Sequence, residues 1–172
     1  YFSYTKTYLA SRPACAALIR LFGDEPEKDV RYGASFDSKR MNVKTPECKL
    51  RLSEVVLMLA EAYCHKGDSE KALKWLNELR RNRIEGISDL TVGTLPEVRK
   101  GDRIVVDCYG KPLTPLLQAI FDERRKEMYM EGDRWYELKR NGCPEWWVIS
   151  NGLKYTTKAY LYTSPISKSD VD

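Results

Sequence analysis

The stretch that decides the fold runs from Arg51 to Arg83 and reads RLSEVVLMLAEAYCHKGDSEKALKWLNELRRNR. Its apolar residues recur at helical spacing in two blocks, and the polar triplet Lys66-Gly67-Asp68 separates them. A glycine just after a last helical turn is a C-terminal signal, and Asp68 or Ser69 can cap a second helix. Two helices joined by so short a connection must run antiparallel as neighbours. The stretch therefore predicts a helical hairpin.

The apolar positions of the two blocks predict which faces are buried. The second block has one apolar side, formed by Ala72, Leu73, Leu76 and Leu79, and predicts a helix to about Arg83. The first block has one apolar face and further apolar residues around it, so we expect this helix to be buried on more than one side. That face consists of Leu52, Val55, Val56, Leu59 and Tyr63.

The hairpin resembles a tetratricopeptide repeat, because its small residues, Tyr63 and the Gly67 turn follow the spacing of that repeat. A single repeat cannot bury its own flanks. Other helices must therefore cover it, either from this chain or from a longer parent chain.

A third long helix is predicted from Thr114-Pro115, a cap followed by proline at the first helical position, through LLQAIFDERRKEMYMEG. One stripe of this helix contains Arg124 and Glu131 among apolar residues. Burying them unpaired would cost several kcal/mol each. We expect Arg124, and also Arg134, to pair with Glu54 or Glu61, which makes Glu54, Glu61, Arg124, Glu131 and Arg134 the candidate structural ion pairs.

The flanks of this helical centre, residues 49–142, are less regular. In the lead-in, residues 1–48, Tyr1 to Tyr8 suggest an extended segment and CAALIRLF a short helix; a surface loop is expected from Gly23 to Arg40. Residues 103–109 could form a short strand, and the tail, residues 143–172, reads as loop with one or two short strands. We therefore expect one mainly α domain over residues 1–172, with irregular loops and a few short strands.

The composition excludes several classes of protein. The net charge of +4 is spread along the chain without a long basic block, which argues against nucleic-acid binding. The longest apolar run, Val55 to Ala60, is far shorter than the roughly 18–20 residues that span a bilayer. Five scattered cysteines and a single histidine, His65, give no basis for a metal site or a disulfide framework.

Catalytic residues are not expected either. Glu123 and Glu127, like Glu54 and Glu61, could form a carboxylate pair of the kind that hydrolyses glycosides. Each has Arg or Lys nearby at helical spacing, however, which favours structural ion pairs and keeps the carboxylates ionised. No phosphate-binding glycine loop or GxSxG motif is present. We expect neither an enzyme nor a cofactor.

Three motifs in order closely resemble the C-terminal hallmarks of the SusD/RagB family: RLSEVVLMLAEA, then ALKWLNELR, then ERRKEMYMEGDRWYELKR. The family's preceding D-x-R motif matches Asp29-Val30-Arg31. The closing SPISKSDVD departs from the family's P-I-P-x-x-E at Ser167 and Asp170.

The resemblance implies a tetratricopeptide-like fold and a non-catalytic role in polysaccharide utilisation. Family members are surface-exposed lipoproteins of the bacterial outer membrane that cover a SusC-type TonB-dependent transporter and help deliver glycans, or sometimes peptides. They are several times longer than this chain, so we expect it to be the C-terminal portion, with the lipid anchor upstream of Tyr1.

Sugar binding needs exposed aromatic faces, because pyranose rings offer apolar C–H surfaces ringed by hydroxyls. The candidates for glycan stacking are Trp146, Trp147, Tyr109 and Tyr155. Core or interface packing is the alternative for these four residues, and we expect Trp75 and Trp135 to be core residues. Two other functions stay open: a helical-repeat module that binds peptides or proteins, and a glycan-active enzyme.

Overall fold

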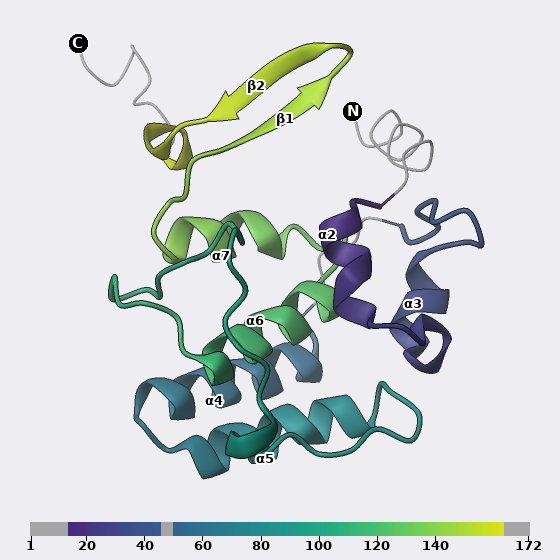
Figure 1. Cartoon of the computed structure of the whole chain (residues 1–172), viewed down its shortest axis with the longest axis vertical. Helices are drawn as coiled ribbons and strands as arrows, with labels where there is room; N and C mark the ends of the chain where they lie inside the picture. Colours follow the sequence, from purple (N-terminus) through teal and green to yellow (C-terminus); the bar gives the residue numbers. More distant parts are fainter. Residues whose placement is uncertain (1–13, 46–49, 164–172) are drawn as a thin grey trace. The chain divides into compact units, whose positions relative to one another are not determined.

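The computed structural model describes residues 14–45 and 50–163 (Figure 1). The extended segment expected at Tyr1 to Tyr8 and the closing SPISKSDVD lie outside the described residues. Contacts group the chain into two compact units. The first contains residues up to Val98 together with Thr114–Arg134, and the second contains Arg99–Leu113 together with the chain from Trp135 onward.

The predicted helical hairpin is confirmed and forms the centre of the first unit. Helix α4 (Leu52–His65) is followed by α5 (Ser69–Arg81), and the two lie against each other (Figure 1). Gly67 has a φ of 77°, a left-handed conformation that favours glycine. Asp68 caps α5, because its Oδ1 accepts a hydrogen bond from the Lys71 backbone N–H at 3.0 Å.

The buried face of α4 differs from the expected one. Leu57 and Ala60 are fully buried, whereas Leu52, Val55 and Met58 are 78%, 48% and 52% exposed. The expectation that apolar residues bury this helix on more than one side is therefore wrong. Helices α5 and α6 cover the face of α4 that carries Leu57 and Ala60, and the apolar residues on its other side stay exposed.

Helix α6 (Pro115–Glu127) contacts both helices of the hairpin (Figure 1). Thr114 Oγ1 accepts from the Leu117 backbone N–H at 3.3 Å, as its place before Pro115 predicts. The shared core is apolar and consists of Leu57, Ala60, Ala72, Leu73, Leu76, Leu79, Leu116, Ala119 and Ile120.

The third helix is not continuous, contrary to the sequence prediction. It ends at Glu127, the chain turns through Met130 with a φ of 65° and Gly132 with a φ of 80°, and α7 (Asp133–Arg140) follows. A left-handed residue cannot continue a right-handed helix, so the stripe drawn through Glu131 and Trp135 does not exist as one helical face.

The N-terminal part of the first unit is more ordered than predicted. The short helix predicted after Pro13 is present as α2 (Ala16–Ile19) and the 3-10 turn η1 (Arg20–Phe22). The expected surface loop instead contains η2 (Pro26–Lys28) and α3 (Val30–Ser35). Asp29 and Arg31 are buried there, and an aromatic cluster packs nearby from Phe22, Tyr32, Phe36 and Tyr129.

The second unit contains the one sheet seen in the described residues, an antiparallel hairpin of β1 (Trp146–Ser150) and β2 (Leu153–Thr157). Asn151 and Gly152 connect the strands with φ values of 51° and 76°, the pattern of a two-residue type I′ turn. The 3-10 turn η4 (Ala159–Tyr162) follows. Residues 103–109 do not form the expected strand and contribute only an isolated bridge between Val106 and Pro112.

Candidate functional site

The last turns of α6 hold a column of buried charges in the first unit. Glu123, Lys126 and Glu127 follow one another at i, i+3 and i+4, so their side chains lie on one face of the helix. Each is at most 6% exposed. Buried charges are stable only when they are paired, so the neighbouring segments must supply partners.

Arg31 supplies the largest number of these pairs. Its Nε and Nη2 donate to the two carboxylate oxygens of Asp29 at 2.8 and 2.7 Å, and Nη2 also lies 2.7 Å from Glu123 Oε2. Burial alone would lower the pKa of Arg31, but its hydrogen bonds to Asp29 and the charge of Glu123 outweigh burial and raise that pKa. Burial would likewise raise the pKa of Asp29, and the hydrogen bonds from Arg31 lower it instead.

Glu127 binds the hairpin to α6. Arg83, just after α5, donates from Nε and Nη2 to its two carboxylate oxygens at 3.0 Å each. Arg51, just before α4, reaches Glu127 Oε1 at 3.3 Å and the Glu127 backbone carbonyl at 2.6 Å. The pKa of Glu127 is lowered, because the contacts with Arg83 and the charge of Arg31 outweigh the burial that would raise it.

The predicted ion-pair residues lie in the same region with partly different contacts. Arg124 Nη2 is 3.5 Å from Glu54 Oε1, but its Nε donates to Asp133 at 2.9 Å, a partner that the sequence analysis did not single out. Glu61 Oε1 lies 3.7 Å from His65 Nε2.

Glu131 and Arg134, the other two predicted ion-pair residues, follow α6 in the sequence. Glu131 Oε1 is held by Lys44 at 2.7 Å and Arg51 at 2.8 Å. Arg134 lies half-buried in the first turn of α7, and its pairing with Glu54 or Glu61 stays a prediction.

This charge network has a structural role: it holds the neighbouring segments against α6. Asp29 and Glu127 stay ionised far below neutral pH, so neither has a proton to donate as a general acid. Arg31 and Lys126, which neutralise Asp29 and Glu123, were missed as ion-pair residues by the sequence analysis. The D-x-R motif at Asp29-Val30-Arg31 was the available signal. It lay inside a predicted surface loop, and a surface position gave no reason for an acidic and a basic residue at that spacing.

The four candidate aromatic residues all belong to the second unit but do not share one face. Val148 pairs with Tyr155 and Trp147 with Thr156 across the hairpin. Because side chains alternate along a strand, Trp146 and Tyr155 lie on one face and Trp147 on the other. Trp147 and Tyr155 therefore cannot stack on the same sugar ring.

Their exposure also differs. Trp147, Tyr155 and Tyr109 are 56%, 53% and 70% exposed, with Tyr109 in the turn after Asp107. Trp146 is half-buried, donates from Nε1 to the Tyr162 hydroxyl at 3.0 Å, and has the Arg103 guanidinium 4.0 Å from its ring centre. Trp146 is thus a packing residue, and Trp147 and Tyr155 are the accessible rings of the hairpin.

The two helical tryptophans differ in the same way. Trp75 is half-buried and packs against the core of the first unit, as expected. The expectation of a core position is wrong for Trp135, which is 40% exposed and stacks on Tyr162 with ring centres 4.6 Å apart.

Within residues 14–45 and 50–163, no helix is long and apolar enough to cross a membrane. The same residues contain no group of three or more His, Cys, Asp or Glu side chains placed to hold a metal ion.

Comparison with known proteins identifies the family. A search among curated proteins found no match. The sequence profile of the SusD family matches residues 26–170, which include the Asp29–Arg31 motif, the α4–α5 hairpin, α6 and the β hairpin. Because this match covers most of the chain, and the mainly α fold agrees with it, the chain belongs to the SusD/RagB family.

Proposed function

We propose that this protein binds glycans without catalysis and delivers them to a SusC-type TonB-dependent transporter at the bacterial outer membrane. Family membership supports a role in nutrient binding. The observation that supports a glycan site in this chain is the exposure of Trp147 and Tyr155 on the β hairpin.

Each ring offers a flat apolar surface beside polar groups. Trp147 shares its face of the hairpin with Thr156 and Lys154, whose Nζ lies 5.2 Å from the ring centre. Tyr155 has its own hydroxyl on the opposite face. A sugar ring that stacks on either aromatic surface would keep its hydroxyls within reach of these donors. We infer that the hairpin presents one stacking ring on each side, so that a glycan chain can lie along either face.

The absence of catalysis is supported by the state of the buried carboxylates. Glu123 and Glu127 on α6 are a carboxylate pair of the kind considered for glycoside hydrolysis. Arg31 contacts both carboxylates, at 2.7 and 3.4 Å. The pKa of Glu127 is lowered, whereas a general acid in glycoside hydrolysis needs a raised pKa.

The proposal places the protein at the cell surface, held by a lipid anchor and closing over its transporter. Its nutrient cargo is an oligo- or polysaccharide. Peptide cargo is the second candidate, and the exposed apolar row Leu52, Val55 and Met58 on α4 favours it, because a helical peptide could lie along such a row.

Affinity gel electrophoresis of the full chain through a panel of soluble polysaccharides tests the proposal. We expect retardation by at least one glycan, with no release of reducing ends. Trp147→Ala and Tyr155→Ala should reduce the retardation, because each removes a stacking surface. Tyr136→Ala is the matched control, since Tyr136 is 70% exposed but lies on α7 outside the hairpin.

Three outcomes would count against the proposal. Release of reducing ends would show an enzyme. Retardation unchanged by both hairpin substitutions would remove the hairpin site. Binding of peptides but of no glycan, abolished by Leu52→Ser and Met58→Ser, would favour the second candidate.

A further inference from the structure

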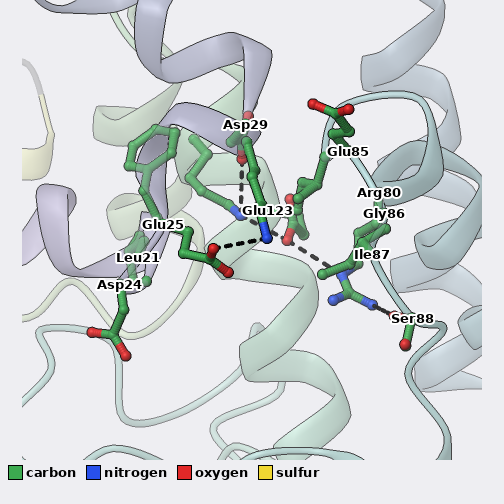
Figure 2. Close-up of a pocket in the computed structure, with 15 residues that line it drawn as sticks. Leu21, Asp24, Glu25, Asp29, Arg80, Glu85, Gly86, Ile87, Ser88 and Glu123 are labelled. Atoms are coloured by element: carbon green, nitrogen blue, oxygen red, sulfur yellow. Dashed lines mark hydrogen bonds and ion pairs between the residues drawn. The ribbon is translucent and has the colours of Figure 1, made fainter.

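The first unit contains a pocket of about 500 Å³ that the charge network does not fill. It lies between the segment Leu21–Asp29 and the loop that follows α5, with α6 beneath (Figure 2). Its apolar wall is formed by Leu21, Phe22, Ile84 and Ile87. Volumes of 300–1,000 Å³ are typical of small-molecule sites.

Two buried cations, Arg80 and Lys126, line the pocket and are 8% and 5% exposed. Lys126 is well paired, because its Nζ lies 2.9 Å from Glu123 and 3.5 Å from Asp29. Arg80 is not: its Nε is 3.6 Å from Glu123 Oε1, and Glu123 also neutralises Arg31 at 2.7 Å. Three cations thus compete for the charge of Glu123.

Within the described part of the chain, the side-chain hydrogen bonds of Arg80 use Nη1 but not Nη2. Nη1 donates to Asn77 Oδ1 at 3.1 Å and to the Ser88 carbonyl at 3.2 Å. Nη2 makes no hydrogen bond with any residue that the structure describes. Figure 2 shows the guanidinium facing the open space between the Leu21–Glu25 segment and the loop at Ser88. A guanidinium N–H pair that faces a pocket and has no protein partner can donate to an acceptor on a ligand.

Electrostatics distinguish Arg80 from the other buried arginine of the network. Burial lowers the pKa of Arg80, and the charges of Glu123 and Asp89 do not make up the difference. The pKa of Arg31 is raised by its partners. The protein therefore compensates the charge of Arg31 and leaves that of Arg80 partly uncompensated.

The acidic residues at the rim face away from Arg80 or are paired with a lysine. The carboxylates of Asp24 and Glu85 point away from the Arg80 guanidinium (Figure 2). Glu25 is neutralised by Lys28, whose Nζ is 2.8 Å from Glu25 Oε1.

We propose that this pocket binds a small ligand through a carboxylate that accepts hydrogen bonds from Arg80 Nη2, with the body of the ligand against Leu21 and Ile87. A sugar acid fits this description, because one ring carries both a carboxylate and C–H surface. The site is in the first unit and involves no residue of the β hairpin, so it does not depend on glycan stacking there.

Isothermal titration of the full chain with galacturonate and with galactose tests the inference, since the two sugars differ at C6 by a carboxylate against a hydroxymethyl group. We expect saturable binding of galacturonate, about tenfold or more tighter than that of galactose, as one charge-assisted hydrogen bond implies. No binding of galacturonate, or equal binding of the two sugars, would overturn the proposal.

Two substitutions locate the site. Arg80→Gln should weaken galacturonate binding about tenfold or more. Because Arg80 is buried, a second variant, Lys28→Glu, changes only the exposed rim, where it adds negative charge beside Glu25; it should weaken binding about threefold or more at low salt. Lys39→Glu is the matched control, an exposed lysine outside the pocket. Equal effects of Lys28→Glu and Lys39→Glu would contradict the assigned site.

The hairpin variant Trp147→Ala separates this inference from the proposed function. Galacturonate binding in the pocket should persist in that variant even where retardation by polysaccharides is lost. Loss of galacturonate binding in Trp147→Ala, with binding kept in Arg80→Gln, would assign the sugar acid to the hairpin and overturn the pocket site.

Discussion

Arg31 Nη2 and Glu123 Oε2 lie 2.7 Å apart although 92 positions separate them in the sequence. Both side chains are about 8% exposed. This contact connects the short helix α3 to α6. Glu127 of α6 also pairs with Arg83, which connects α6 to the α4–α5 hairpin. The first unit is therefore held by an apolar core between α4, α5 and α6 and by a buried charge network at one end of α6.

Removing Arg31 should strongly destabilise the protein. Arg31→Ala strands Asp29 and reduces the neutralisation of Glu123, and breaking a buried ion pair from one side costs about 3–5 kcal/mol. Urea unfolding should show a lower midpoint with an unchanged slope. Arg81→Ala is the matched control, because the Arg81–Glu78 pair is about half exposed and should matter little. Similar midpoints for the two variants would show that the network does not stabilise the fold.

Acid should weaken the fold through the same network. The pKa values of Asp29 and Glu127 lie below their ordinary values of 3.8 and 4.5 in the folded state, so the unfolded chain takes up protons first as the pH falls. Their stabilising contribution is present above the ordinary values and is lost as the pH falls through the folded-state pKa values. Denaturation midpoints measured from about pH 6 down to about pH 3 should therefore decrease.

Asp29→Asn identifies the source of this acid sensitivity. The variant should be less stable at neutral pH but should show a flatter dependence of stability on pH below about 4, because one of the linked carboxylates is gone. An unchanged slope in Asp29→Asn would assign the acid sensitivity to other groups.

The Tyr162 hydroxyl should stabilise the second unit. It accepts from Trp146 Nε1 at 3.0 Å and donates to the Pro144 carbonyl at 2.9 Å, and Tyr162 is 2% exposed. Tyr162→Phe should cost about 1–3 kcal/mol, because it leaves two partners without hydrogen bonds. Tyr160→Phe, at a site 71% exposed, should change little. Thermal unfolding followed by tryptophan fluorescence compares them, and equal transitions would contradict a role for the hydroxyl.

Gly142 should not tolerate alanine. A Cβ at this position would lie 2.6 Å from Val106 Cγ2, and Gly142 has a φ of 86°. Gly142→Ala should destabilise the protein by about 1–3 kcal/mol through overpacking and backbone strain. Gly33→Ala is the control, because no atom lies within 4 Å of its Cβ position and it is inside α3.

The two causes can be separated with a double variant. Val106→Ala should restore part of the stability of Gly142→Ala by relieving the contact, while the strain from φ remains. No recovery at all would show that backbone strain alone accounts for the loss.

How far the sequence predicts this structure depends on the range of the interactions involved. The α4–α5 hairpin and the start of α6 were predictable, because caps, the Gly67 turn and helical spacing are local signals. The β hairpin also had a local signal, Asn151-Gly152 between two strand-forming runs, which predicts a type I′ turn. The end of the helix at Glu127 had only a weak local signal. Gly132 indicates a turn, but it does not show that Met130 adopts a left-handed conformation.

The charge network was predictable only in part. Helical spacing shows that Glu123 and Glu127 share a face, but it cannot show that Arg31, Arg51 and Arg83 meet them there. Periodicity also failed for α4, because an apolar face with Leu52 and Val55 looks like a core face until a neighbouring helix is placed. The exposure of Trp147 and the two-sided arrangement of the hairpin required the strand register, which alternation alone does not supply.

The distance in sequence between Arg31 and Glu123 has a consequence during synthesis. Asp29 and Arg31 leave the ribosome long before α6 is made, and the hairpin with Arg51 and Arg83 follows. At that stage, among the residues that the structure describes, the three arginines of the network have only Asp29 as a carboxylate partner. Only when the segment Glu123–Glu127 emerges can these pairs close together. A nascent chain halted before residue 123 would therefore carry these cations without their α6 carboxylates, a form that chaperones and proteases could distinguish from the finished protein.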